Sequence, residues 1–151
     1  MVQGEVIDID RILLELELLP EFDKQISLQG VKGQTDPFYG IGRSTELNHA
    51  EEDFIHPLFD MPYLYSILEE HEMFRSRVMK MKPGTCYSYH QDPTKRKHIP
   101  LVTNDKCFFV VEDKVVRFPI EYKVKILDTT KMHTAVNASL EDRIHIVGCI
   151  K

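Results

Sequence analysis

The sequence predicts a mainly β protein, a sandwich, jelly roll or small barrel, on which N-terminal helices pack. Its 151 residues suit one domain with a single core, so we expect residues 1–151 to form one unit. Patterns before residue 73 are helical or irregular, whereas those after it are short β-like runs separated by turns. We therefore expect a helical and loop portion (residues 1–73) that covers a β-core (residues 74–151).

Two helices are expected in the N-terminal portion. A leucine-rich stretch has apolar residues at helical spacing and ends at Pro20, and a second helical pattern has Pro62 near its first turn. Between them, residues 31–45 (VKGQTDPFYGIGRST) carry turn-forming residues and predict a long loop, of which residues 33–42 (GQTDPFYGIG) are a candidate lid over the site. We expect the leucine-rich helix to pack on the barrel, with a homodimer interface as the alternative. Its apolar positions are Ile9, Ile12, Leu13, Leu16 and Leu19.

The β-core is expected to contain eight short strands. The breaks between them include Pro83-Gly84, Asn104-Asp105 and Pro119, residues that turn or end a strand. Short strands at this spacing are typical of sandwiches, jelly rolls and small barrels. The expected strands lie near residues 75–82, 85–90, 98–102, 106–111, 114–118, 123–128, 133–136 and 143–150.

Composition and charge are those of an ordinary soluble globular protein. The net charge of −5 gives no reason to expect broad attraction to nucleic acid or to an anionic membrane. Apolar runs fall far short of the roughly 20 residues of a membrane helix, and the N-terminus has acids where a secretory signal has basic residues. Three widely spaced cysteines favour free thiols. We therefore expect a cytoplasmic protein that binds neither nucleic acid nor membrane.

A candidate metal site begins in the stretch CYSYHQDPTKRKHIPL (residues 86–101). His90 and Asp92 lie two residues apart at the end of an expected strand, so their side chains can project to the same face. His133 opens the penultimate strand and supplies a third ligand. Two histidines and one carboxylate on one face of an octahedron suit non-haem Fe(II) and leave positions for a cosubstrate and O2. We predict these three residues as metal ligands at the catalytic centre.

An acidic cosubstrate would need a cationic partner beside this metal. Arg143 lies ten residues after His133, at the start of the last strand, and its guanidinium can bind a carboxylate through two parallel hydrogen bonds. His98 lies on the strand after His-Gln-Asp and could donate to a second carboxylate near the metal. These two residues are the predicted cosubstrate-binding pair.

Five segments share their order and spacing with a known family. They are MKPG (81–84), HQD (90–92), RKHIPL (96–101), LDTTKMHTAVN (127–137) and DRIHIVG (142–148). From about Arg77 to Ile150 the chain resembles the aspartyl/asparaginyl β-hydroxylase family, within the Fe(II)/2-oxoglutarate-dependent dioxygenases. Residues 1–73 match no motif of this family, so the resemblance covers about half of the chain.

The resemblance implies a double-stranded β-helix (jelly roll, cupin-like) with iron at the mouth of the barrel. It also implies that 2-oxoglutarate chelates the iron, that Arg143 holds its far carboxylate, and that His98 lies near its 1-carboxylate. Arg96, in an Arg-x-His pattern, is implied to contact an acidic group of the substrate. His145 shares the strand face of Arg143, and either reaches the pocket or is a hydrogen-bonded interior histidine. Met79 lies where some relatives have a small hydroxyl residue.

The function that follows is hydroxylation of a C–H bond, with 2-oxoglutarate and O2 as cosubstrates and release of succinate and CO2. The substrate expected is an Asp or Asn side chain, or a related one, of a protein, a peptide or a free amino acid. One alternative is a cupin-type metalloenzyme that does not use 2-oxoglutarate and has little need of Arg143. The other is a non-catalytic jelly-roll binding module, in which the histidines affect stability or partner binding and no turnover.

Overall fold

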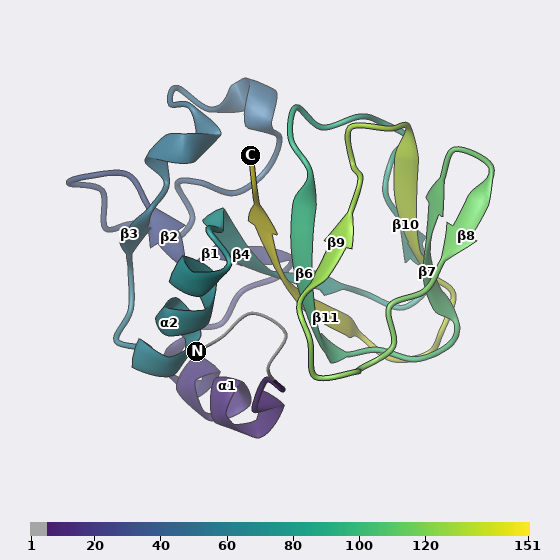
Figure 1. Cartoon of the computed structure of the whole chain (residues 1–151), viewed down its shortest axis with the longest axis horizontal. Helices are drawn as coiled ribbons and strands as arrows, with labels where there is room; N and C mark the ends of the chain where they lie inside the picture. Colours follow the sequence, from purple (N-terminus) through teal and green to yellow (C-terminus); the bar gives the residue numbers. More distant parts are fainter. Residues whose placement is uncertain (1–5) are drawn as a thin grey trace.

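The computed structural model of the protein describes residues 6–151, which form two main antiparallel β-sheets and a two-stranded ribbon, with helices against the outer side of the larger sheet (Figure 1). Residues 1–5 lie outside the described residues. The predictions that include them, a single domain over residues 1–151 and an acidic N-terminus, therefore fall partly outside the described part of the chain. The mainly β, cupin-like fold class predicted from the sequence is confirmed. The helices are α1 (Ile9–Glu15) and α2 (Pro62–Glu70), with 3-10 turns at Leu16–Leu18, Ser44–Glu46 and Glu51–Asp53; the strands are β1 (Gln25–Ser27), β2 (Gln29–Gly30), β3 (His56–Pro57), β4 (Phe74–Met81), β5 (Thr85–Cys86), β6 (Arg96–Val102), β7 (Cys107–Val111), β8 (Lys114–Val116), β9 (Lys125–Leu127), β10 (His133–Asn137) and β11 (Arg143–Cys149).

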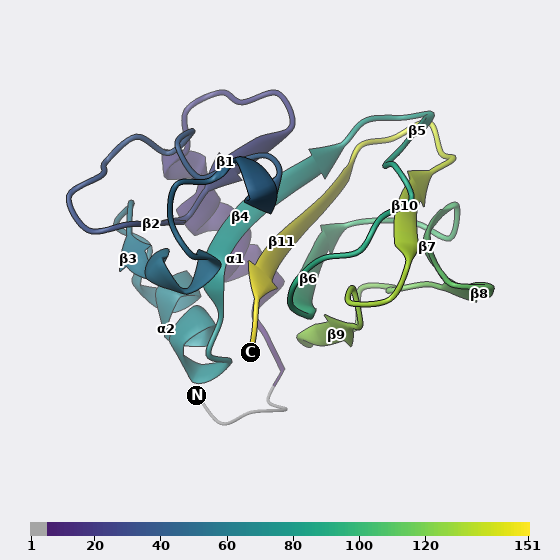
Figure 2. The same ribbon diagram turned by 90° about the horizontal axis from the view of Figure 1, so that it is seen from above.

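The larger sheet has the strand order β1-β4-β11-β6-β9, and the smaller one the order β5-β10-β7-β8. β2 and β3 form a separate ribbon. Figure 2 shows β4, β11 and β6 in the middle of the molecule, with the smaller sheet on one side and the N-terminal segment on the other. The chain repeatedly crosses between the two sheets, as in a jelly roll, so the faces that look at each other are built from strands distant in sequence.

Both faces of the larger sheet are covered. On the outer face, Val78, Ile99 and Ile146 pack with apolar residues of α1 and α2 in the main core. On the inner face, Met81 packs with Phe109 and with residues of β9 and β10 in a second, smaller cluster. Because successive side chains of a strand point to opposite faces, polar residues at the inward positions of β4 and β11 are enclosed between the sheets.

The two expected helices are present, and α1 is shorter than the pattern predicts. It ends at Glu15 and continues as a 3-10 turn to Leu18, and Leu19 is extended, as residues before proline usually are. Ile12 is fully buried, whereas Leu13, which was expected on the same face, is 38% exposed because it lies at the edge of the buried stripe. No helix between residues 6 and 151 has the length and apolar composition of a membrane span.

The N-terminal portion also contains β1, β2 and β3, which the interpretation of residues 1–73 as helical or irregular missed. Their runs of two or three residues are too short to show strand alternation. β1 extends the larger sheet by pairing with β4, with Ile26 opposite Val78. The strand expected at 85–90 is confined to β5, and the chain after it is irregular. These differences matter because β1 and the irregular segment border the site.

Candidate metal centre

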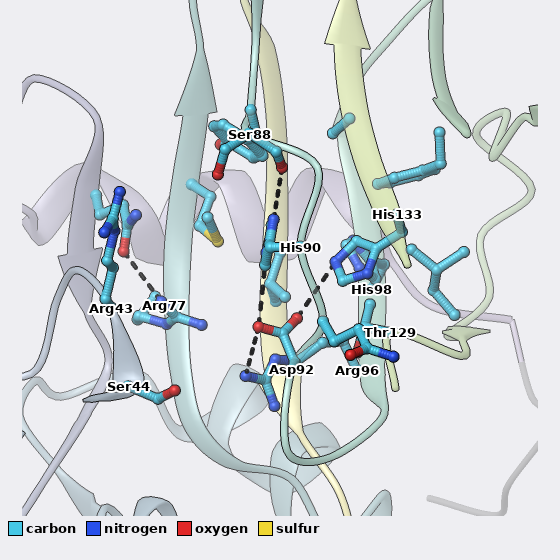
Figure 3. Close-up of a pocket in the computed structure, with 18 of the residues that line it drawn as sticks. Arg43, Ser44, Arg77, Ser88, His90, Asp92, Arg96, His98, Thr129 and His133 are labelled. Atoms are coloured by element: carbon cyan, nitrogen blue, oxygen red, sulfur yellow. Dashed lines mark hydrogen bonds and ion pairs between the residues drawn. The ribbon is translucent and has the colours of Figure 1, made fainter. Parts of the chain in front are cut away.

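Backbone pairing brings His90, Asp92 and His133 together (Figure 3). His133 opens β10, and His90 forms an isolated bridge with it, through His90 N to His133 O (3.0 Å) and His133 N to His90 O (2.9 Å). The backbone N–H of Asp92 donates to the carbonyl of Thr129 at 2.8 Å. The irregular segment after β5 therefore places two of the three side chains against the start of β10.

The three side chains converge on one small volume. Nε2 of His90 lies 3.6 Å from Oδ1 of Asp92, and Nε2 of His133 lies 3.4 Å from Oδ2 of the same carboxylate. One possible ligand atom of each residue lies within 4.8 Å of the other two, and no other such group of three occurs among residues 6–151. His133 is buried, whereas His90 and Asp92 are half-buried, and all three line one cavity.

Backbone carbonyls set the tautomer of both histidines. Nδ1 of His90 lies 2.6 Å from the carbonyl of Ser88, and Nδ1 of His133 lies 2.8 Å from that of Lys131. A carbonyl only accepts, so each Nδ1 carries a proton, and Nε2, the ring nitrogen that faces Asp92, is the atom that would bind a metal after losing any proton of its own. Histidines that bind a metal usually donate their other ring N–H in this way.

The charge state of Asp92 also suits a cation. Burial opposes its ionisation, but the hydrogen bond with His133 and the charge of Arg96 hold the pKa of Asp92 below its usual value. Burial likewise opposes protonation of His133, yet the carboxylate of Asp92 raises the pKa of this imidazole. Two imidazole nitrogens and one ionised carboxylate, with positions left open toward a cavity, fit non-haem Fe(II).

The cavity beside these residues has a volume of about 490 Å³ and is lined from both sheets and from the N-terminal loop. Its apolar lining includes Met79, Phe109 and Leu127. Its charged lining consists mainly of arginine side chains, and Asp92 is the only carboxylate among the described residues that line it. These arginines are Arg43, Arg75, Arg77, Arg96 and Arg143. The cavity is therefore suited to anionic ligands.

Arg143 lies where the sequence places it, at the start of β11 and in the wall of the cavity. It is 2% exposed, and its guanidinium lies 5.6 Å from the centre of the Phe109 ring. Its Nε is buried without a hydrogen-bond partner among the described residues, and burial lowers the pKa of the group. A buried cation with an unused donor fits a carboxylate ligand such as the far end of an acidic cosubstrate.

His98 and His145 form a buried pair on adjacent strands. Their Nδ1 atoms lie 3.0 Å apart, and burial, followed by the charge of Arg143, holds both pKa values well below the usual histidine range. Both rings are therefore neutral, and one Nδ1 donates to the other. His98 lines the cavity, whereas His145 contacts His98 and lies outside the cavity lining. Of the two alternatives predicted for His145, a pocket residue or a hydrogen-bonded interior histidine, the structure has the second.

A profile of the aspartyl/asparaginyl beta-hydroxylase family matches residues 15–150, which include all the predicted site residues. The chain belongs to this family. The match extends the resemblance seen in the β-core into the N-terminal portion, where the sequence shows no family motif that we could identify. A search of curated proteins found no match.

Solved structures similar to this β-hydroxylase family member include cupin domains, which align with about half of it. A cupin 2 conserved barrel protein from Salinispora arenicola is 17% identical, with 50% of this chain and 61% of that chain covered and a TM-score of 0.40. A cupin domain from Bordetella pertussis is 14% identical, with 51% and 80% covered and a TM-score of 0.44. A predicted oxalate decarboxylase from Thermotoga maritima is 16% identical, with 56% and 74% covered and a TM-score of 0.40. Likenesses this distant say nothing about activity.

In this β-hydroxylase family member, Arg96 lies beside the candidate metal ligand Asp92 and is held by a residue that the sequence does not single out. Its Nη2 lies 3.5 Å from Oδ1 of Asp92 and 3.1 Å from Oε2 of Glu51. Burial opposes the ionisation of Glu51, but Arg96, a hydrogen bond from Cys149 and Arg75 together hold its pKa below the usual value. Glu51 is one of three consecutive acids and lies far from Arg96 in the chain, so no sequence signal distinguishes it.

Arg77, which lines the cavity, is a second residue that the sequence analysis missed. It is 4% exposed on β4, and its donors reach Oε1 of Gln25 (3.1 Å) and the carbonyl of Arg75 (3.3 Å). No carboxylate lies within ion-pair distance of it among residues 6–151. Burial, followed by the charge of Arg75, lowers the pKa of Arg77 to about 10. Strand alternation could have found it, because Arg75 and Arg77 both occupy inward positions of β4.

Proposed function

We propose that this protein is an Fe(II)- and 2-oxoglutarate-dependent hydroxylase. The observation that carries the proposal is the convergence of two Nε2 atoms and one carboxylate on a cavity whose wall holds a buried arginine with an unused donor. Membership of the aspartyl/asparaginyl beta-hydroxylase family supports an enzyme of this kind. Iron and 2-oxoglutarate, when bound, supply the oxidation: O2 converts 2-oxoglutarate to succinate and CO2 and a substrate C–H bond to C–OH.

Each predicted residue has a role in this proposal. His90, Asp92 and His133 hold the iron, and the carbonyls of Ser88 and Lys131 keep both imidazoles in the tautomer that binds it. Arg143 binds the far carboxylate of 2-oxoglutarate, and His98 lies near its 1-carboxylate. The apolar part of the cavity wall keeps water away from the reacting carbon of the substrate and so limits side reactions with water.

The proposed substrate is an Asp or Asn side chain, or a related group, in a protein, a peptide or a free amino acid. Arg96 stays the predicted contact for an acidic substrate group, although Asp92 and Glu51 already lie beside its guanidinium. Arg77 is a further candidate, because its described partners are an amide and a carbonyl and a carboxylate would neutralise its buried charge. We therefore expect succinate release to be stimulated more by an acidic compound than by its neutral amide.

The decisive experiment is anaerobic titration of the protein with Fe(II) and then with 2-oxoglutarate. A chelated 2-oxo acid gives ferrous iron a visible charge-transfer absorption, so the readout does not require a known substrate. The variants His133→Ala and Arg143→Ala are compared with the wild type. The proposal expects the absorption in the wild type, its loss in His133→Ala through lost iron, and its loss in Arg143→Ala with iron binding retained.

The same titration separates the alternatives. Iron binding without the absorption would contradict 2-oxoglutarate use and favour a cupin-type metalloenzyme. A wild-type protein that binds no Fe(II) would contradict the catalytic reading and favour a jelly-roll binding module.

A further inference from the structure

We propose that Glu51, from the N-terminal portion, is a positioning residue that orients the metal-binding carboxylate of Asp92 through Arg96. The inference rests on the metal site of the proposed function and concerns a residue outside the five family-like segments. It gives the N-terminal portion a part in building the metal site, beyond covering the barrel.

A single nitrogen links the three side chains. Nη2 of Arg96 lies 3.1 Å from Oε2 of Glu51 and 3.5 Å from Oδ1 of Asp92, so this one atom faces both carboxylates. Nη1 of Arg96 is also within 3.5 Å of Oε1 of Glu51, and it donates to the carbonyl of Thr94 at 3.3 Å. Glu51 therefore contacts both terminal nitrogens of Arg96, and one of them, Nη2, also reaches the carboxylate that would hold the metal.

Glu51 is itself held from two strands of the larger sheet. Nη1 of Arg75, on β4, lies 2.8 Å from its Oε2, and Sγ of Cys149, at the end of β11, lies 3.3 Å from the same oxygen. Arg75 also donates to the carbonyls of Gly40 (3.2 Å) and Gly42 (2.7 Å) in the loop before the 3-10 turn of Glu51. Glu51 is only 8% exposed, so these contacts fix the position of its carboxylate.

Charge explains why the arrangement depends on Glu51. Two buried guanidinium groups, those of Arg75 and Arg96, share this one carboxylate. Without it, Arg96 would have Asp92 as its only carboxylate partner among the described residues. A cation drawn fully onto Asp92 competes with a metal for the same oxygens, whereas a cation divided between two carboxylates supports one oxygen and leaves the other for the metal.

The test measures the affinity for Fe(II) alone, under anaerobic conditions and without 2-oxoglutarate. The variant is Glu51→Gln, which keeps the shape of the side chain and removes its charge. The matched control is Glu52→Gln, one residue later and exposed. We expect Glu51→Gln to weaken Fe(II) binding by about 10-fold, the lower end of the effect of losing a direct partner of a metal ligand, because Glu51 acts on Asp92 through Arg96. Glu52→Gln should leave the affinity unchanged, and an unchanged affinity in Glu51→Gln would overturn the inference.

A double-mutant cycle distinguishes positioning through Arg96 from a general structural effect. In an Arg96→Met background, Arg75 and Glu51 still form a one-to-one pair, so the fold should persist. If Glu51 acts through Arg96, adding Glu51→Gln to this background should change the Fe(II) affinity less than twofold. An equal loss of affinity in both backgrounds would show that Glu51 acts through Arg75 and the loop, and would overturn the inference.

A second variant applies if Glu51→Gln does not fold. Arg96→Lys keeps a charge near Glu51, but one ammonium nitrogen cannot reproduce the guanidinium fork, in which two nitrogens face the two oxygens of Glu51 while Nη2 also reaches Asp92. We expect at least fivefold weaker Fe(II) binding, and unchanged binding would overturn the inference. Failure of the proposed function is a separate result, because it would appear as a wild-type protein that binds no Fe(II) or no 2-oxoglutarate.

Discussion

Replacing Arg143 with methionine should produce two effects of opposite sign. Methionine is unbranched and apolar, so it can follow the path of the arginine stem beside Phe109 without the charge. Arg143 would form two hydrogen bonds to a carboxylate, and hydrogen bonds to charged groups contribute about 1.5–3 kcal/mol each. Their loss would cost about 3–6 kcal/mol of binding free energy, which raises the dissociation constant for 2-oxoglutarate by about 10²- to 10⁴-fold.

The ligand-free protein should be more stable in the same variant. Burial lowers the pKa of Arg143, whose Nε has no partner among the described residues, so the charge is unfavourable until an anion binds. Removing it should raise the melting temperature by roughly 2–4 °C, which corresponds to about 1 kcal/mol in a chain of this length.

The assay combines 2-oxoglutarate titration of the Fe(II) protein with thermal unfolding of the ligand-free protein. Arg117→Met is the control, because Arg117 is exposed outside the cavity lining and should change neither quantity. An Arg143→Met protein that binds 2-oxoglutarate as the wild type does would refute the assignment of this residue. A lower melting temperature would refute the claim that its charge is uncompensated.

Three further predictions concern the metal site, Glu51 and Arg77. Asp92→Ala should reduce Fe(II) affinity at least 100-fold, because it removes the anionic ligand; metal titration checks this, and near wild-type affinity would contradict the site. The pKa of Glu51 is lowered in the folded protein, so its stabilisation is present above its ordinary pKa of 4.5 and is lost as pH falls through the lower folded value. The difference in free energy of unfolding between wild type and Glu51→Gln should therefore shrink below pH 4.5, and a difference that stays constant to lower pH would contradict the ion pairing. Arg77→Met should lower succinate release with acidic substrates more than with their amides; an equal loss with both would exclude Arg77 from substrate recognition.

Local patterns in the sequence were enough for most of the β-core. Turn residues such as Pro83-Gly84 and Asn104-Asp105 mark strand ends directly, so the strands near them were expected within a few residues of where they lie. Strands of two or three residues carry no such pattern. β1 exists because the edge of β4 offers it hydrogen bonds, which is a property of the assembled sheet.

The sequence by itself determined the fold class and the chemical types at the candidate metal site. The order and spacing of His90, Asp92, His133 and Arg143 were sufficient to predict the candidate set, because a jelly roll brings strand ends together. Strand geometry applies to His133 and Arg143, whereas His90 and Asp92 lie in the irregular segment after β5 and are placed by backbone hydrogen bonds to His133 and Thr129. Only the tertiary structure decided which other charges meet there. Glu51 reaches Arg96 across 45 residues and Arg77 is enclosed without a carboxylate partner among the described residues, since burial and pairing depend on how distant segments pack rather than on local sequence.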